Sequence, residues 1–159
     1  MPFQKVVNSY QAPAVAGDFA SANPNASMLA GEGALVAGDS GVTVGVFAWA
    51  DTDGKVSNKK ATNGRIGFVH REQQASITDF LDEQGNTILK GQAMTLMIGG
   101  DFWAHFPAGA VIGQNVFAKD TDGTLKSSAA ATESGYTLTK FKVASTASAG
   151  ELAKITSLE

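Results

Sequence analysis

The residues most able to do chemistry lie in the stretch Gly38–Val42, which reads GDSGV. Its first four letters match the sequence around the nucleophile of chymotrypsin-like serine proteases. Such a serine needs a histidine as its base and an aspartate to orient that histidine, and in those proteases both precede the serine. The two histidines of this chain, His70 and His105, both follow Ser40. We therefore interpret Ser40 as a turn residue, and we expect no enzymatic activity.

A metal site could be built from two histidines and two carboxylates, which is a sufficient ligand set for zinc. The candidates are His70, Glu72, Asp101 and His105. Their spacing fits no recognised zinc motif, and the cationic Arg71 beside them disfavours a bound cation. We expect a polar or ion-paired cluster instead, such as Arg71 with Glu72 or Asp101, and neither a metal nor any other cofactor.

A short sequence occurs twice: VFAWADTDG begins at Val46 and VFAKDTDG begins at Val116. Neither copy places glycine and glutamate where an EF-hand calcium loop needs them. Asp-Gly after a β-branched and aromatic run is typical of a hairpin turn. The repeat therefore predicts two similar β-hairpins.

Four aromatic residues could form a flat platform for stacking on sugars: Trp49, Phe102, Trp103 and Phe106. A carbohydrate-binding β-sandwich module, used for surface adhesion, is thus the alternative function. Strand alternation sends Phe102 and Trp103 to opposite faces, so one of them is expected to pack inside.

The composition favours a protein that contacts other proteins. The chain has 159 residues, of which 43% are apolar, enough for one sizeable core. Charged residues make up 17%, against about 25% in an average domain, and charge depletion marks the centres of interfaces. The net charge of −3 argues against direct nucleic-acid binding. The chain lacks cysteine, and we expect neither a secretion signal nor a membrane span.

Residues 1–41 differ from the rest of the chain. They hold three of the four prolines and show no regular period of apolar residues. We predict an extended N-terminal arm with loops, which lies on its own domain or on a neighbouring subunit. The stretch GDSGV ends the arm, and residues 42–159 are predicted to form the folded domain.

From Val42 onward the pattern is that of short strands separated by glycines. Residues 42–49 are expected to form one continuous strand, and residues 136–145 a strand with a change of register. The one candidate for a short helix is at residues 76–85. The fold class is therefore all-β: an antiparallel β-sandwich or barrel, jelly-roll-like, with an N-terminal arm and at most one short helix. Six aromatic residues are its core candidates: Phe47, Trp49, Phe68, Phe102, Trp103 and Phe117.

Five stretches in order resemble the structural cement, or capsid decoration, proteins of tailed bacteriophages. They are GDFASANPNASMLAGEGALVAG (17–38), VTVGVFAWAD (42–51), GFVHREQQASI (67–77), GGDFWAHF (99–106) and IGQNVFA (112–118). The resemblance covers residues 16–118 and continues weakly into the C-terminal strands. Residues 52–64 and 119–133 carry no such pattern and are interpreted as variable surface loops.

The resemblance implies a non-enzymatic protein that binds the outer surface of the capsid in the virion. Its partners would be the major capsid protein, whose neighbouring subunits it clamps, and copies of itself in a dimer or trimer. We expect the arm to make much of the capsid contact. Its candidate contact residues are Phe3, Tyr10, Phe19, Asn23 and Pro24.

Overall fold

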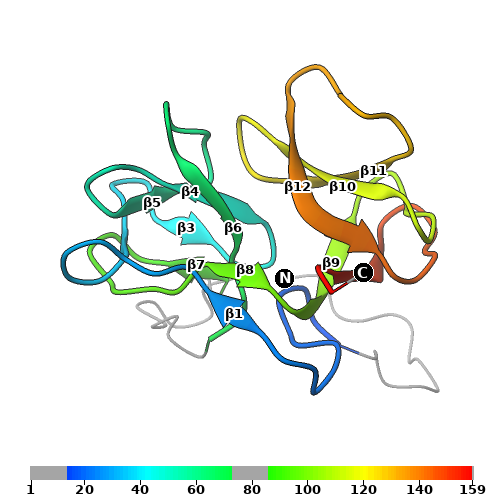
Figure 1. The fold of residues 1–159 in the computed structure, drawn as a ribbon, viewed down its shortest axis with the longest axis horizontal. Helices are drawn as coiled ribbons and strands as arrows, with labels where there is room; N and C mark the ends of the chain where they lie inside the picture. The colour runs from blue at the N-terminus through cyan, green and yellow to red at the C-terminus, as the bar shows by residue number, and fades with distance from the viewer. Residues whose placement is uncertain (1–13, 73–85, 159) are drawn as a thin grey trace, which may run out of the picture.

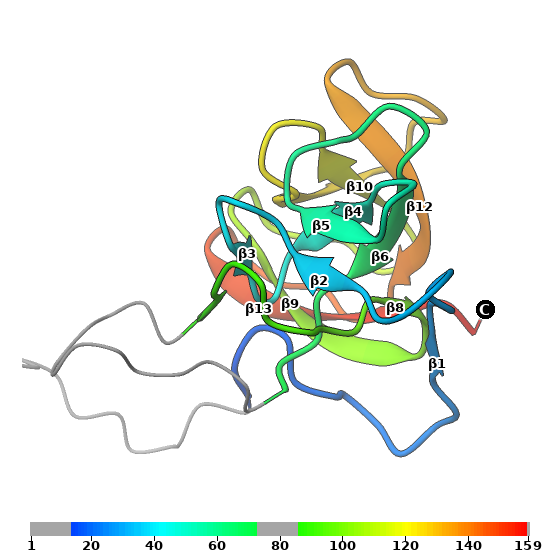
Figure 2. The ribbon, with the colours of Figure 1, turned by 90° about the vertical axis from the view of Figure 1, so that its left-hand side faces the viewer.

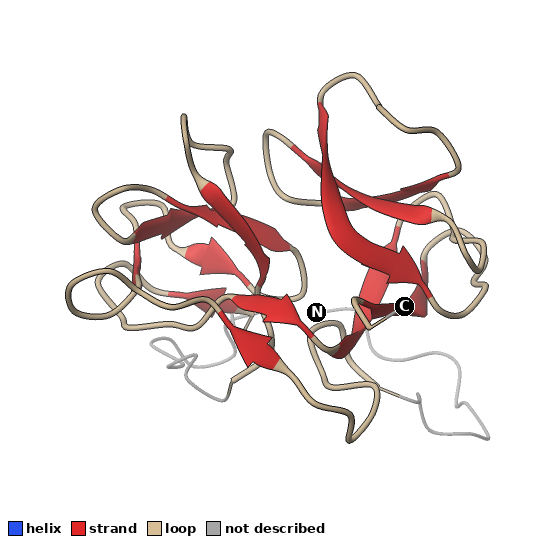
Figure 3. Ribbon diagram, in the orientation of Figure 1, coloured by secondary structure: helices blue, strands red, loops and turns tan. Residues whose placement is uncertain are grey.

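The computed structural model describes residues 14–72 and 86–158, and within these ranges the chain forms strands, turns and loops with no helix (Figures 1 and 3). The helix predicted at residues 76–85 falls outside the described residues. Nothing in the described part is a helix long and apolar enough to span a bilayer. The all-β class is confirmed.

The strands are β1 (Ala26–Ser27), β2 (Val36–Ala37), β3 (Val42–Thr43), β4 (Phe47–Ala50), β5 (Lys55–Ser57), β6 (Arg65–Phe68), β7 (Thr87–Ile88), β8 (Met97–Gly99), β9 (Asp101–Phe106), β10 (Asn115–Lys119), β11 (Leu125–Ser128), β12 (Tyr136–Val143) and β13 (Glu151–Thr156).

The described strands form two curled sheets and one small ribbon, seen as two lobes in Figure 1. The first lobe holds a six-stranded sheet in the order β1-β8-β6-β4-β5-β2, and β3 pairs with β7 beside it. The second lobe holds a five-stranded sheet in the order β11-β10-β12-β13-β9. Pairing is antiparallel except between β2 and β5, which run parallel. Figure 2 shows the first lobe from its own side.

Four phenylalanine rings join the two lobes. Phe47 and Phe68 come from β4 and β6, and Phe102 and Phe141 come from β9 and β12. Ring centroids lie 5.0 Å apart for Phe68 and Phe102, and 5.6 Å apart for Phe47 and Phe141. All four rings are buried in one apolar cluster that also holds Trp49. Tilted and edge-to-face pairs at such distances add to the free energy of apolar burial, so this cluster fixes one sheet against the other.

A second apolar cluster fills the inside of the first lobe. It uses the opposite face of β4, where Ala48 and Ala50 point away from Phe47 and Trp49, because side chains alternate along a strand. Val42, Val56 and Leu96 lie in the same cluster and are fully buried. The central strand β4 is therefore buried on both faces, and the chain has two adjoining cores.

The strand expected at residues 42–49 is in fact two strands, β3 and β4, separated by a turn at Val44–Val46. Gly45 lies at a φ of +80°, in the left-handed region. A Cβ there would lie 2.9 Å from the Cβ of Ala16, so the turn also brings the N-terminal segment close. The prediction of one strand is wrong because this continuous apolar run forms two strands. β3 pairs with β7 in the small ribbon, and β4 lies in the six-stranded sheet.

The repeated sequence forms the two predicted hairpins. β4 pairs with β5, and β10 pairs with β11, both antiparallel. Asp51 Oδ1 accepts hydrogen bonds from the backbone N–H groups of Asp53 and Lys55, and Asp122 Oδ1 accepts one from the N–H of Thr124. The aspartates thus stabilise turns.

The register change expected near the end of β12 is present. Asn115 lies opposite Lys142, whereas Phe117 lies opposite Leu138, so two residues of β10 span four of β12. Alternation within β12 nevertheless runs unbroken from Leu138 onward, with Leu138, Lys140 and Lys142 exposed and the residues between them buried.

Candidate functional site

The GDSGV stretch is a turn. The N–H of Gly41 donates to the carbonyl of Gly38 over 3.0 Å, and Ser40 is exposed. His70 Nδ1 lies 3.3 Å from the carbonyl oxygen of Gly17, and His105 Nε2 lies 3.1 Å from that of Gly150. Neither histidine contacts Ser40 within the described residues, so this serine has no adjacent base.

The metal candidates are dispersed in the same way. No group of three potential metal-ligating side chains gathers anywhere in residues 14–72 and 86–158. Asp101 binds Ser21 and Asn23, and Glu72 Oε1 lies 3.7 Å from Nε2 of His70. Polar contacts are therefore present at these residues, but Arg71 forms no ion pair with Glu72 or Asp101 in the described part of the chain.

The aromatic platform is not formed. Trp49, Phe102 and Phe106 are buried in the core. Of the proposed four rings, only Trp103 is accessible, and Nζ of Lys154 lies 5.1 Å from its centroid. The expectation that Trp103 belongs to the core is wrong, because alternation along β9 turns it to the outer face of the sheet. The other five core candidates are buried: Phe47, Trp49, Phe68, Phe102 and Phe117.

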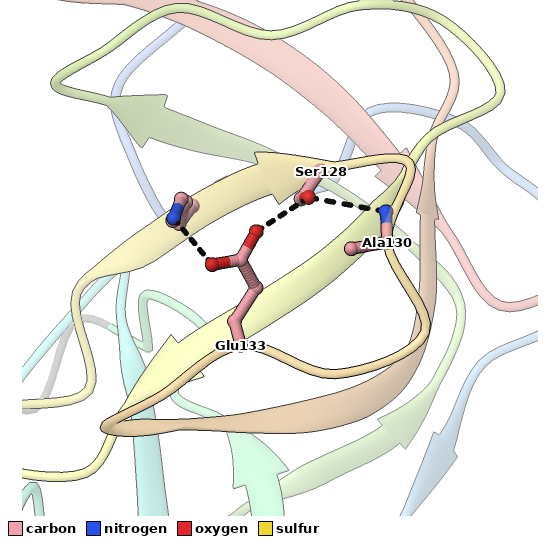
Figure 4. Close-up of polar contacts among 4 residues, drawn as sticks. Ser128, Ala130 and Glu133 are labelled. Carbon is pink, nitrogen blue, oxygen red and sulfur yellow. Dashed lines mark hydrogen bonds and ion pairs between the residues drawn. The ribbon is translucent and has the colours of Figure 1, made fainter.

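Phe117 differs from the other buried aromatics in its position. Val116 and Ala118 belong to the core between the lobes, while Phe117 lies in neither apolar cluster and points to the other face of β10. The loop after β11 is held by Glu133 (Figure 4). The Glu133 carboxylate accepts from Ser128 Oγ at 2.6 Å and pairs with Lys126 Nζ at 2.7 Å, which lowers the pKa of Glu133.

The described part of the predicted arm lies on its own domain. Residues 17–20 pair with the outer edge of β9: Gly17 N–H donates to Trp103 O, and Trp103 N–H donates to Asp18 O, over 2.8 and 2.9 Å. Farther along, β1 and β2 are strands of the six-stranded sheet. This segment therefore covers a sheet edge that would otherwise expose unpaired backbone groups.

Phe19 is the candidate contact residue best placed to meet a partner. Its ring centroid lies 4.4 Å from that of His70 and 5.3 Å from that of Phe102, yet 42% of the residue remains exposed. Pro24 is also exposed. Phe3 and Tyr10 lie outside the described residues.

Asn23 has a structural partner in Asp101. Asp101 Oδ2 accepts from Ser21 Oγ and from Asn23 Nδ2, each over 2.6 Å. Burial acts to raise the pKa of Asp101, but hydrogen bonds from Ser21, Thr156 and Asn23 outweigh it and the pKa is lowered. The ionised carboxylate thus holds the 21–23 loop beside a surface hollow of about 340 Å³, to which Lys154 and Leu158 also contribute.

Two exposed surfaces were missed by the sequence predictions. The first is on β12, where Leu138, Lys140 and Lys142 share the outer face; we call it the lysine strip. The second is a groove of about 860 Å³ on the first lobe. The alternation of Leu and Lys along β12 could have indicated the strip.

The groove could not be read from the sequence, because its walls come from three separate segments: residues 29–34, residues 51–54 and the neighbourhood of Asn63 and Arg65. Leu29 is 85% exposed, and its carbonyl accepts from Arg65 Nη1 over 3.0 Å. Glu32 and Asp53 are exposed in the same lining. We call this surface the acidic groove.

The comparisons with known proteins agree with one another. Residues 3–157 match the model of the family described as XM1 gp53 minor capsid protein. A chain from the solved capsid of Myoviridae phage XM1 has the same fold, with a TM-score of 0.67 and 16% identity over 99% of this chain and 98% of that one. No curated protein sequence matches. Because the family model spans nearly the whole chain, this protein belongs to the XM1 gp53 minor capsid protein family of tailed bacteriophages.

Proposed function

We propose that the protein is a non-enzymatic cement protein, which binds the outer surface of a tailed-phage capsid and clamps neighbouring subunits of the major capsid protein. The observation that carries this proposal is the family match over residues 3–157. A capsid structural role in the virion follows from the family, and the clamping role goes one step further.

The two-lobed shape supports a clamp, because a protein that bridges two subunits needs two separate contact surfaces. Each lobe exposes large apolar side chains. Leu29 and Ile98 lie in the first lobe, and Ile112, Leu138 and Leu158 lie in the second. Binding at one surface raises the effective concentration for binding at the other, so modest contacts sum to a stable attachment.

Capsid contact by the arm is part of the same proposal. Phe19 and Pro24 are exposed, residues 17–20 are fixed to β9 by backbone hydrogen bonds, and Phe3 and Tyr10 precede them in the sequence. Asn23 contributes by holding this loop to Asp101. The contact would therefore combine this fixed loop with the aromatic side chains of Phe3 and Tyr10.

Capsids that lack this protein provide the test. The purified chain is added to them and binding is measured by co-sedimentation, while capsid disruption on heating is followed by light scattering. A clamp must bind in a saturable manner and raise the disruption temperature. Saturable binding with an unchanged disruption temperature would contradict clamping but leave decoration intact.

A further inference from the structure

We propose that the connection between β9 and β10 is an apolar anchor, which packs Val111 and Ile112 against an uncharged surface of a major capsid subunit. The inference rests on the proposed capsid function and names one contact that carries it. We call residues 107–113 the anchor loop.

The anchor loop exposes two adjacent large apolar side chains. Val111 is 51% exposed and Ile112 is 62% exposed, and Pro107 and Ala108 in the same loop are also exposed. Among the described residues, Val111 and Ile112 are the only neighbours in sequence that are both large, apolar and exposed. Single exposed apolar residues are common on protein surfaces, whereas a contiguous apolar patch marks a contact site.

Backbone hydrogen bonds hold the anchor loop in place. Ala110 and Ala147 exchange two bonds of 2.9 and 3.0 Å, and the N–H of Gly113 donates to the carbonyl of Val143 over 2.8 Å. These bonds lie on either side of the two exposed side chains, so a fixed backbone presents both of them. Binding through a loop that is already ordered costs less conformational entropy than binding through a loop that must first be ordered.

The surroundings of the anchor loop carry no charge. Because Ala110 pairs with Ala147, the loop lies beside residues 144–150, at the end of the second lobe that points away from the first (Figure 1). Residues 107–118 and 144–150 hold no Asp, Glu, Lys or Arg. Exposed charges occur at Lys142 and Glu151, which flank the second of these stretches. An apolar centre with charges only at its rim is the pattern of a protein–protein contact.

This chemistry selects a protein as the partner. A nucleic acid or an anionic membrane surface would require lysine or arginine beside the apolar side chains, and neither stretch has one. The chain belongs to a family of capsid proteins, so the protein surface that it meets in the virion is that of the shell. The major capsid protein forms the shell and is therefore the partner that fits.

Titration of the purified chain onto capsids that lack it, with binding measured by co-sedimentation, tests the proposal. Val111→Ser with Ile112→Ser should raise Kd about tenfold or more, because two apolar side chains at the centre of the contact are lost. The loss should be equal at low and high salt, since apolar contact, unlike an exposed ion pair, is not screened. Thermal melts by circular dichroism establish that each variant is folded.

Val111→Ile with Ile112→Val is the matched control, since it exchanges the two side chains and keeps the loop apolar. It should bind like the wild type. Serine substitutions that leave the affinity of the folded chain unchanged would overturn the anchor while the cement function stands. So would an exchange variant that binds as weakly as the serine variant.

A wild-type chain that does not bind capsids at all is a failure of the cement function itself, and the anchor falls with it. Sedimentation velocity of both chains without capsids covers the remaining case. A wild-type assembly that the serine substitutions dissociate would show that the loop joins copies of the chain, and capsid contact through it would be wrong.

Discussion

The peptide N–H of Phe47 donates a hydrogen bond of 3.0 Å to the carbonyl of Gly123. Phe47 begins β4 in the first lobe, and Gly123 lies in the turn between β10 and β11 of the second. The two hairpins that share a repeated sequence therefore meet. The turn between β10 and β11 lies against β4, the first strand of the other hairpin. Lys60 N–H, which donates to Asp120 O over 2.8 Å, extends the same junction.

Gly123→Ala should be strongly destabilising. A Cβ there would lie 1.9 Å from the carbonyl oxygen of Phe47, and Gly123 has a φ of +73°. Steric overlap with backbone adds to the cost of a left-handed alanine, so we expect a loss of about 3 kcal/mol or more in the free energy of unfolding. Urea denaturation at neutral pH measures it.

Gly135→Ala is the control for that substitution. Gly135 has a φ of +75° but no neighbouring atom within 4 Å of the added Cβ. Its cost should be that of the backbone conformation alone, about 1–2 kcal/mol. Equal losses for the two variants would show that the contact with Phe47 does not join the lobes as described.

Phe102→Ala and Trp103→Ala should differ although the residues are neighbours on β9. Phe102 is fully buried and contacts three other phenylalanine rings of the core and arm, so its truncation should cost about 3–5 kcal/mol. Trp103 lies on the outer face beneath Lys154, and its truncation should cost clearly less, about 1–2 kcal/mol. Chemical denaturation of both variants provides the comparison. The account fails here if Trp103→Ala is the more destabilising.

The fold class was predictable from the sequence because short β-branched and aromatic runs alternate with glycines. The assignment of particular residues was less reliable where tertiary contacts decide the outcome. The run from Val42 to Trp49 reads as one strand, yet contact with Ala16 and the φ of Gly45 divide it between two sheets. Alternation correctly separated Phe102 from Trp103 but does not say which face is covered.

Asp101→Asn should destabilise the protein in a manner that depends on pH. The pKa of Asp101 in the folded protein lies below its ordinary value of 3.8. The ionised carboxylate therefore stabilises the fold fully above that value, and this contribution is lost as pH falls through the folded pKa. We expect the variant to lose about 2 kcal/mol at pH 7, from the weakened bonds to Ser21 and Asn23.

The difference between wild type and Asp101→Asn should shrink as the pH is lowered from 5 toward 2, and denaturation curves across that range measure it. Asp39→Asn is the comparison variant, because the lowered pKa of Asp39 arises from a fully exposed pair with Lys90. Its effect on stability should be small at every pH. A pH-independent loss for Asp101→Asn would contradict the role given to the charge.

Deletion of residues 1–13 should weaken capsid binding without unfolding the protein. The deletion removes Phe3 and Tyr10 but keeps the hydrogen bonds of residues 17–20 to β9. Phe19→Ala tests the part of the arm that remains, where loss of one half-exposed ring should weaken binding by about 1–2 kcal/mol. Co-sedimentation with undecorated capsids measures both. Unchanged binding by both variants would show that the arm is not the contact.

The candidate contact surfaces were only partly predictable from the sequence. Scattered aromatic residues marked the arm, and Phe19 remains accessible although it packs on His70. Asn23 reads as an ordinary turn residue, and its bond to Asp101 joins positions 78 apart in the chain. The acidic groove has no sequence signal, since Glu32 and Asp53 meet only after β1, β2 and the β4–β5 hairpin have folded together.

Electron cryomicroscopy of undecorated capsids, imaged with and without the added chain, tests the cement function most directly. The account predicts new density on the outer surface, with the two lobes of each copy resting on different major capsid subunits. Density confined to a single subunit, or density on the inner face of the shell, would contradict it.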